Sequence, residues 1–244
     1  MKAYYHSIET FGTVDGQGIR YVLFLAGCSL GCVFCHNPDT WSCGEKVITI
    51  SEILADYQKY RAFYDASGGG ITVSGGEPLL QADFVAELFK ACREAGIHTT
   101  LDTAGYCTQE SVFKVIPYTD AVLFSIKAAT AEQYRFLTVA DNTAILANLR
   151  LFAAHIPLTL RYVLIPGITD SISDLAQLAD LIKTLPSLVP VELLAYHTLG
   201  REKWLKLGLK YGLEEVPDAT NAQMARAKSQ LEEQGIRVLF NSLG

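Results

Sequence analysis

Three cysteines, Cys28, Cys32 and Cys35, stand close together in the spacing C-x3-C-x2-C, directly after the apolar run 20–26. Such a loop can wrap three thiolates around one inorganic centre, and it leaves a fourth coordination position without a protein sulfur. An open position is where substrate chemistry can occur. The fold must therefore present this loop at the end of a strand, where a substrate can reach it.

The spacing alone leaves two kinds of metal centre open. Zinc would use the three cysteines and His36, but His36 directly follows Cys35, whereas structural zinc sites usually take paired ligands from two separate knuckles. An iron-sulfur cluster in which one iron lacks a cysteine ligand suits three clustered cysteines better, although common ferredoxin clusters use four. Cys92 and Cys107 are interpreted as small buried or incidental thiols.

The sequence indicates a reducing compartment. Residues 1–6 contain no apolar signal core, and no run approaches the ~18 apolar residues of a membrane span. We therefore expect a cytoplasmic protein without membrane contact, in which clustered cysteines bind metal rather than form disulfides. The net charge of -6 and the lack of clustered Lys and Arg argue against nucleic acid as a partner.

Strand and helix patterns alternate along the whole chain. Strands are expected at 20–26, 71–74, 98–102, 121–126, 158–165, 191–195 and 236–240, and helices at 49–64, 83–95, 109–116, 142–154, 172–185 and 221–234. Alternation of this kind predicts a parallel sheet covered by helices. About six strand-helix units are fewer than the eight of a closed barrel. We therefore predict one α/β domain over residues 1–244, a partial (β/α)6 TIM-like barrel that is splayed open, in preference to a doubly wound sheet.

Functional groups are expected at the carboxyl ends of these strands. Polar or backbone-exposing residues do follow the predicted strands, at Gly75-Gly76-Glu77, Asp102-Thr103, Ser125, Lys127 and Tyr196-His197. Together they describe the mouth of a site.

Arg161 is notable because it lies inside the apolar run 158–163. An unpaired cation there would cost several kcal/mol, so Arg161 must either meet an anion or face a polar cavity. A structural ion pair and a functional contact both fit this requirement.

These segments resemble a known family. An aromatic residue before the last cysteine, here Phe34, is similar to the signature of the radical S-adenosylmethionine enzymes. Further segments resemble, in unbroken order along nearly the whole chain, the family of activases that act on pyruvate formate-lyase, a glycyl radical enzyme: Gly12-Thr13-Val14-Asp15-Gly16, Cys35-His36-Asn37, Ser67-Gly68-Gly69-Gly70, Ser74-Gly75-Gly76-Glu77, Leu101-Asp102-Thr103, Arg161-Tyr162-Val163, Tyr196-His197, Leu199-Gly200 and Lys203-Trp204.

The resemblance implies a mechanism. Cys28, Cys32 and Cys35 would ligate three irons of a [4Fe-4S] cluster, and the fourth iron would chelate the amino and carboxylate groups of S-adenosylmethionine. One electron from the reduced cluster would break a carbon–sulfur bond of the sulfonium. The resulting 5′-deoxyadenosyl radical would take a Cα hydrogen from one glycine of pyruvate formate-lyase. A flavodoxin or ferredoxin would supply the electron, and the family expectation is a monomer.

The resemblance also assigns contacts. The pair Gly75–Gly76 would let the main chain approach S-adenosylmethionine and offer its carbonyls to the ammonium group, although a plain tight turn would look the same. Lys127 would face the methionine carboxylate, and Arg161 would face the site with Val163 near the adenine. Asp15 would contact the partner's glycyl radical loop, with turn capping as the competing interpretation. The other residues assigned to the cofactor are Phe34, His36, Asn37, Glu77, Asp102, Thr103, Ser125 and His197.

The chain departs from the family at one predicted ion site. Two residues before the lysine the family usually has an aspartate, which helps to hold a monovalent cation with the equivalents of Asp102, Thr103 and the Leu123 carbonyl. Here Ser125 keeps an oxygen but removes a full negative charge, so we expect a weaker or altered sodium or potassium site. Two other positions, where Pro and Asn are usual, hold Gln17 and Ala104.

Three functional hypotheses follow. The chain activates pyruvate formate-lyase, or performs the same chemistry on another glycyl radical enzyme or a small molecule, or is a non-enzymatic zinc or iron-sulfur module. Many other glycyl radical activases carry additional clusters in a cysteine-rich insertion. No such insertion stands between the cysteine loop and Gly75, and Cys43 is isolated, which favours the first hypothesis.

Overall fold

The chain is described by a computed structural model that covers residues 1–239. It forms two compact units. Within the described residues, the first unit comprises 1–29, 40–123 and 155–157, and the second comprises 30–39, 124–154 and 158–239. The cysteine loop is thereby divided, because Cys28 belongs to the first unit whereas Cys32 and Cys35 belong to the second.

The first unit is built on strands that neighbour one another in the order β3-β1-β2-β4-β5. Strand β1 pairs antiparallel with β2 and β3, whereas β2, β4 and β5 are parallel. The parallel strands are largely buried, as strands covered on both faces are. Strand β2 is mostly apolar, whereas β5 is rich in threonine. The bounds are β1 (Lys2–Gly12), β2 (Arg20–Leu25), β3 (Val47–Thr49), β4 (Gly70–Gly75) and β5 (His98–Thr103).

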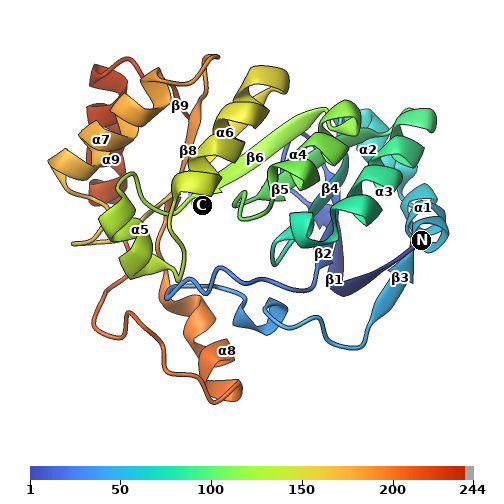
Figure 1. Cartoon of the computed structure of the whole chain (residues 1–244), viewed down its shortest axis with the longest axis horizontal. Coiled ribbons are helices and arrows are strands. Elements are labelled where there is room, and N and C mark those ends of the chain that lie inside the picture. Colours follow the sequence, from blue (N-terminus) through green and yellow to red (C-terminus); the bar gives the residue numbers. More distant parts are fainter. Residues whose placement is uncertain (240–244) are drawn as a thin grey trace. The chain divides into compact units, whose positions relative to one another are not determined.

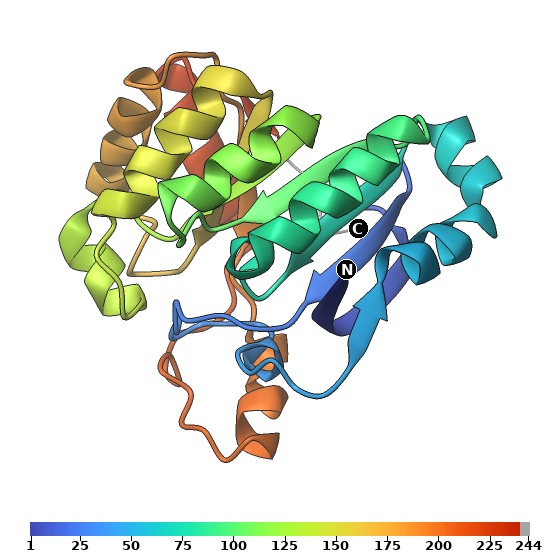
Figure 2. The same ribbon diagram turned by 45° about the vertical axis from the view of Figure 1, so that its right-hand side comes forward.

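Helices cover one face of these strands, as Figures 1 and 2 show for this unit. The bounds are α1 (Ile50–Gln58), α2 (Arg61–Ser67), η2 (Pro78–Gln81), α3 (Ala82–Glu94), α4 (Gln109–Val115) and η3 (Ile116–Tyr118). A complete capping box between Thr49 and Glu52 begins α1. Because β2 and β4 are in parallel register, with Leu25 opposite Gly75, the cysteine loop and the Gly75–Gly76 turn leave the sheet at the same edge.

The second unit contains the parallel strands β7 (Leu158–Leu164), β8 (Val191–Ala195) and β9 (Val238–Leu239). Its helices are α5 (Ala131–Leu137), α6 (Thr143–His155, of which the last residue belongs to the first unit), α7 (Ile172–Lys183), α8 (Arg201–Lys206) and α9 (Asn221–Glu233). Helices α7 and α9 pack side by side (Figure 1). A short helix, η4 (Thr198–Gly200), precedes α8, and η1 (Pro38–Thr40) and β6 (Ala121–Ile126) each contribute residues to both units.

The predicted fold class is confirmed: parallel strands alternate with helices in an open α/β arrangement. Strand β3 is terminal in the first unit and β9 in the second, so the described sheet does not close into a barrel. No helix within residues 1–239 combines the length and the apolarity that a membrane crossing requires.

Several local predictions need correction. The single helix expected at 49–64 is two helices, α1 and α2, because the chain breaks at Lys59–Tyr60. The strands β1 and β3 and the helices α5 and α8 were not predicted. Of the strand expected at 236–240, residues Val238–Leu239 are extended and Phe240 lies outside the described residues.

Candidate active site

The predicted site residues divide between the two units. Those of the first unit are Asp15, Cys28, Gly75, Gly76, Glu77, Asp102, Thr103 and Leu123. Those of the second are Cys32, Phe34, Cys35, His36, Asn37, Ser125, Lys127, Arg161, Val163 and His197. Within each unit most of them lie on the cysteine loop or near the carboxyl ends of parallel strands.

The glycine pair after β4 packs directly against the start of the cysteine loop. A Cβ on Gly75, whose φ is +120°, would lie 2.2 Å from the carbonyl oxygen of Leu25. A Cβ on Gly76 would lie 2.2 Å from the carbonyl oxygen of Gly27 and 3.0 Å from the Cβ of Cys28. Backbone packing alone therefore requires glycine at both positions. The pair fixes the main chain around Cys28, a role that the sequence did not reveal.

Glu77 directs its carboxylate into the protein interior. Its Oε1 accepts hydrogen bonds from the Thr103 hydroxyl at 2.6 Å and from the Leu79 N–H at 3.1 Å, and its Oε2 accepts one from the Ala104 N–H at 3.0 Å. Burial raises the pKa of Glu77, and these hydrogen bonds oppose the rise. Glu77 thus joins the glycine turn to the end of β5. A direct contact with the cofactor stays a prediction.

Asp102 and Ser74 meet at the carboxyl ends of β5 and β4. The Ser74 hydroxyl donates a hydrogen bond of 2.7 Å to Asp102 Oδ2. The hydroxyl of Thr103 is buried and also accepts from the Gly105 N–H at 2.8 Å. Oxygen atoms therefore line this strand edge. The cation site predicted to include Ser125 stays a prediction.

Arg20 was not predicted as a site residue, yet it holds the turn that contains Asp15. The side chain is fully buried, and it donates from Nε to Thr72 Oγ1 and from Nη2 to Thr100 Oγ1, each at 2.9 Å. Nη1 donates to the Gln17 carbonyl at 3.4 Å, and the Thr72 hydroxyl donates to the Asp15 carbonyl at 2.7 Å. Burial lowers the pKa of Arg20 to about 10. A cation that opens an apolar strand was the available signal.

In the second unit, Cys32 and Cys35 bound a tight turn. The Cys35 N–H donates to the Cys32 carbonyl at 3.0 Å, and the Val33 N–H donates to the carbonyl of Leu137 in α5 at the same distance. From α8, Trp204 Nε1 donates to the Cys35 carbonyl at 2.8 Å. Two helices that the sequence did not predict therefore fix the backbone of this turn.

Lys203 extends the same attachment to the end of the loop. Its Nζ donates to Asn37 Oδ1 at 2.7 Å and lies 3.2 Å from Asp39 Oδ2. The residue before α8 also packs against the backbone of the loop, since a Cβ on Gly200 would lie 2.9 Å from the Cα of His36. The side chain of Asn37 is thus engaged by Lys203 in this structure.

His36 and His197 form an edge-to-face pair with ring centroids 4.9 Å apart. Burial lowers the pKa of His36, and the nearby His197 and Lys203 lower it further. The Nδ1 atom of His197 is buried and has no hydrogen-bond partner among residues 1–239. An orphaned polar atom of this kind needs an explanation, and a ligand that completes the site would provide one.

Arg161 in β7 meets Glu192, its neighbour in β8. The distance from Arg161 Nε to Glu192 Oε2 is 2.7 Å, and the two side chains are 10% and 8% exposed. The anion that the sequence required for Arg161 is therefore present, and the structural ion pair held open above exists. Glu192 was missed, although a carboxylate inside the apolar run 191–195 carries the same signal as Arg161.

The other predicted contacts are partly exposed: Phe34, Ser125, Lys127 and Val163. Val163 stands two residues after Arg161 in β7, so the two side chains share a face of the strand. Their contact with a cofactor stays a prediction.

The donor chemistry fits an iron-sulfur cluster with an open iron. None of the six cysteines is joined in a disulfide, so no disulfide competes for the loop. The backbone of the Cys32–Cys35 turn is held by the hydrogen bond from Trp204. The buried His197 Nδ1 without a hydrogen-bond partner lies in the same unit as this turn. Across residues 1–239, no three His, Cys, Asp or Glu side chains already form a metal-binding group. Ligation by the three cysteines is therefore carried forward as a prediction.

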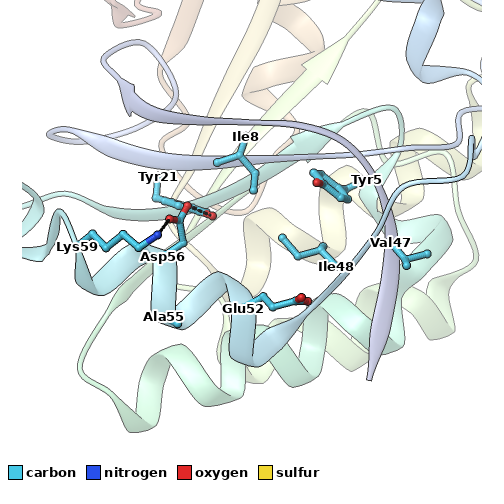
Figure 3. A pocket seen from close by; sticks show the side chains of 9 residues that line it. All are labelled: Tyr5, Ile8, Tyr21, Val47, Ile48, Glu52, Ala55, Asp56 and Lys59. Atoms are coloured by element: carbon cyan, nitrogen blue, oxygen red, sulfur yellow. Dashed lines mark hydrogen bonds and ion pairs between the residues drawn. The ribbon is translucent and has the colours of Figure 1, made fainter.

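A pocket of about 380 Å³ lies elsewhere in the first unit (Figure 3). Its charged groups are already paired, because Asp56 accepts from the Tyr21 hydroxyl at 3.1 Å and from Lys59 Nζ at 2.9 Å, and Glu52 caps α1. We assign it no part in the site. It is lined by Tyr5, Ile8, Tyr21, Val47, Ile48, Glu52, Ala55, Asp56 and Lys59.

Comparison with known proteins places this arrangement. The model of the radical SAM superfamily matches residues 22–182. The chain is 43% identical over 239 residues to the pyruvate formate-lyase-activating enzyme of Listeria monocytogenes, covering 93% of this chain and 95% of the relative. It is also 43% identical over 225 residues to the enzyme of that name from Staphylococcus aureus, covering 88% of this chain and 90% of the relative.

Solved structures share the fold. A radical SAM methyltransferase from Sphaerobacter thermophilus aligns with a TM-score of 0.69 and 20% identity, over 95% of this chain and 72% of the other. A domain of the pyruvate-formate lyase-activating enzyme from Bacteroides vulgatus aligns with a TM-score of 0.60 and 24% identity, over 71% of this chain and 99% of the other.

Proposed function

The chain belongs to the radical SAM superfamily and, within it, to the pyruvate formate-lyase-activating enzymes, and we propose that it cleaves S-adenosylmethionine reductively to place a glycyl radical on pyruvate formate-lyase. The observation that carries this proposal is the 43% identity that extends over 93% of the chain. The hypothesis of a non-enzymatic zinc or iron-sulfur module is disfavoured, because these relatives are enzymes. The single-domain hypothesis is kept, because the family match at 22–182 includes residues of both units.

We propose that Cys28, Cys32 and Cys35 hold a [4Fe-4S] cluster. When bound, this cluster would supply the electron that cleaves S-adenosylmethionine into methionine and a radical that removes the glycine Cα hydrogen, which then resides on 5′-deoxyadenosine. The lack of disulfides among the six cysteines supports the assignment. It also supports a cytoplasmic location, where thiols remain reduced.

The residues around the cysteines position and insulate rather than react. Gly75 and Gly76 hold the backbone at Cys28 by close packing, and Trp204 holds the backbone at Cys35 by a hydrogen bond. Arg20 secures the turn of Asp15, which would contact the glycine-bearing loop of the partner. A site held by paired interior groups in this way is organised before its substrate arrives, which favours a single reactive geometry.

Charged and polar side chains would bind the zwitterionic part of S-adenosylmethionine. Lys127 offers a cation for its carboxylate, and the main chain of the Gly75–Gly76 turn offers acceptors for its ammonium group. His197 offers the buried unpaired Nδ1. Arg161, which pairs with Glu192, would face the cofactor from β7.

We further propose a weakened monovalent cation site at Asp102, Thr103, Leu123 and Ser125. Its weakness would follow from the missing carboxylate at Ser125. Activity and cofactor affinity should depend on sodium or potassium less steeply than in a Ser125→Asp variant. An equally steep dependence in both proteins would contradict the proposal.

The function is tested with anaerobically reconstituted, reduced protein. Mixed with S-adenosylmethionine and pyruvate formate-lyase, it should produce the glycyl radical doublet in electron paramagnetic resonance. Cys32→Ala should abolish the doublet, and Cys43→Ala should retain it. Cleavage of S-adenosylmethionine without a doublet would redirect the proposal to another glycyl radical enzyme or a small molecule. Absence of 5′-deoxyadenosine would overturn the radical chemistry itself.

A further inference from the structure

Helix α8 and the residues that follow it expose apolar side chains beside lysines. Leu205, Leu207 and Leu209 are 77%, 47% and 37% exposed. The side chain of Lys206 is 77% exposed, and Lys210 is exposed as well. We call these five residues the α8 surface. Exposed apolar groups bordered by charge are characteristic of protein interaction sites rather than of an inert surface.

The opposite side of α8 is attached to the cysteine loop. Trp204 is buried and donates to the Cys35 carbonyl, and Lys203 donates to Asn37. Figures 1 and 2 show α8, in orange, beside the blue segment 30–39 of the same unit. An α-helix with its side chains is about 10–12 Å across. A partner on the α8 surface would therefore lie about one helix diameter from the backbone of a predicted cluster ligand.

The charge of this segment is opposite to that of the chain. Residues 199–210 contain four basic residues and one acidic residue, whereas the whole chain carries a net charge of -6. Lys203 is paired with Asp39 on the side of the cysteine loop, and Lys206 lies 3.9 Å from Glu202 of the same helix, so the positive excess of the α8 surface comes from Lys206 and Lys210 against one acidic neighbour. Glu214 and Glu215 follow and confine the basic character to this segment. A local positive field on an acidic protein attracts and orients an acidic partner, and it repels a basic one.

We propose that the α8 surface docks the acidic one-electron carrier protein that reduces the cluster, an inference that rests on the proposed function. The leucines would supply the desolvated centre of a small, transient interface, and Lys206 and Lys210 would pair with carboxylates of the carrier. One electron leaves the carrier, which is oxidised, and enters through the loop that α8 holds. That electron is consumed in breaking one carbon–sulfur bond of S-adenosylmethionine, so one carrier molecule is oxidised for each glycyl radical formed.

The test compares two reductants on the reconstituted full-length enzyme. Binding of an acidic flavodoxin is measured by calorimetry at low and high salt, and radical formation is measured with reduced flavodoxin or with dithionite. The variant is Lys206→Glu/Lys210→Glu. The matched control is Lys183→Glu/Lys228→Glu, which makes the same charge change on α7 and α9.

The variant should bind flavodoxin at least tenfold more weakly at low salt and should lose flavodoxin-driven radical formation in proportion. With dithionite, the variant should form the radical to within about twofold of the wild type. The control should match the wild type in both flavodoxin binding and radical formation. Leu205→Ala/Leu207→Ala should weaken binding with little dependence on salt. Absence of radical formation by the wild type with dithionite would overturn the proposed function instead.

Three outcomes would overturn the docking proposal. In the first outcome, the variant Lys206→Glu/Lys210→Glu binds flavodoxin as tightly as the control does. In the second outcome, the variant also loses radical formation with dithionite and binds pyruvate formate-lyase more weakly, which would make the α8 surface a site for the lyase. In the third outcome, the variant loses binding to phosphatidylserine vesicles but not to flavodoxin, which would make the α8 surface a lipid contact.

Discussion

Replacing Glu192 by glutamine should destabilise the protein strongly, because it leaves the cation of Arg161 buried without its carboxylate. The two groups are 2.7 Å apart, and their side chains are 10% and 8% exposed. At an effective dielectric constant of about 20, charges at this separation attract by about 6 kcal/mol. In the wild type, the cost of desolvating the two charges offsets most of this attraction. When one partner is removed, the desolvation cost of the remaining charge is no longer compensated. We expect Glu192→Gln to lower the free energy of unfolding by about 3–5 kcal/mol.

The double variant Arg161→Met/Glu192→Met separates the pair from its burial. Apolar side chains of similar volume remove both desolvation penalties, so this variant should be as stable as the wild type or more stable. Urea unfolding of the two single variants and the double variant gives the coupling free energy. The control Asp180→Asn breaks an exposed pair with Lys183 and should change stability by less than about 1 kcal/mol. Single and double variants that are equally destabilised would refute the reasoning.

The same double variant tests the role of Arg161. A folded, reconstituted Arg161→Met/Glu192→Met protein that binds S-adenosylmethionine as tightly as the wild type would restrict Arg161 to a structural ion pair. A loss of affinity without a loss of stability would support its proposed contact with the cofactor.

Three further predictions concern the glycine turn, a histidine and the thiols. Gly76→Ala should displace the cysteine loop, lower the free energy of unfolding in urea by about 1–3 kcal/mol and reduce the iron bound after reconstitution. The control Gly96→Ala, whose added Cβ meets no neighbour, should bind iron normally. Equal iron contents in the two variants would contradict this prediction. Burial, followed by Arg20, lowers the pKa of His98 below 6.5, so the unfolded chain binds more protons and stability should fall as pH falls below 6.5. His98→Gln should flatten this decline, and an unchanged profile would count against it. Iodoacetamide at pH 8 should label exposed Cys43 quickly and leave Cys92 unlabelled in mass spectra, because burial raises the pKa of Cys92 to about 12.

The alternation of strands and helices was readable from the sequence because most parallel strands are continuous apolar runs between capped helices. The run 121–126 and the run 191–195 match β6 and β8 to the residue. Strand β1 was missed because its side chains are mostly exposed or half-buried and polar, so neither alternation nor a continuous apolar run marks it. Its strand character comes from pairing with β2 and β3, which is tertiary information.

Helix α5 illustrates a signal that was present. The Thr130 side chain accepts from the Gln133 N–H, and the Thr-x-x-Gln pattern that produces this cap is visible in the sequence. Helix α8 has no side-chain cap and only six residues, so its propensity is weak. Its position depends on Trp204 and Lys203 binding the cysteine loop. No local pattern reveals such a contact across more than 160 residues.

The site could be predicted as a set of strand ends but not as a set of partners. The glycine pair after β4 was predicted, yet the carbonyls that exclude a Cβ from it belong to a segment about fifty residues earlier. Arg20 and Glu192 carry the same signal as Arg161, a charge in an apolar strand, but their partners are visible only once the register of the sheet is known. Motif reasoning identifies reactive groups more readily than the groups that hold them.

The central claim is that a radical derived from S-adenosylmethionine takes hydrogen directly from a glycine of pyruvate formate-lyase. The most direct test uses pyruvate formate-lyase in which the glycine Cα hydrogens are replaced by deuterium, with mass spectrometry of the 5′-deoxyadenosine formed in a single turnover. We expect one deuterium in the 5′-deoxyadenosine for each glycyl radical that forms. Unlabelled 5′-deoxyadenosine accompanied by a full glycyl radical signal would contradict it.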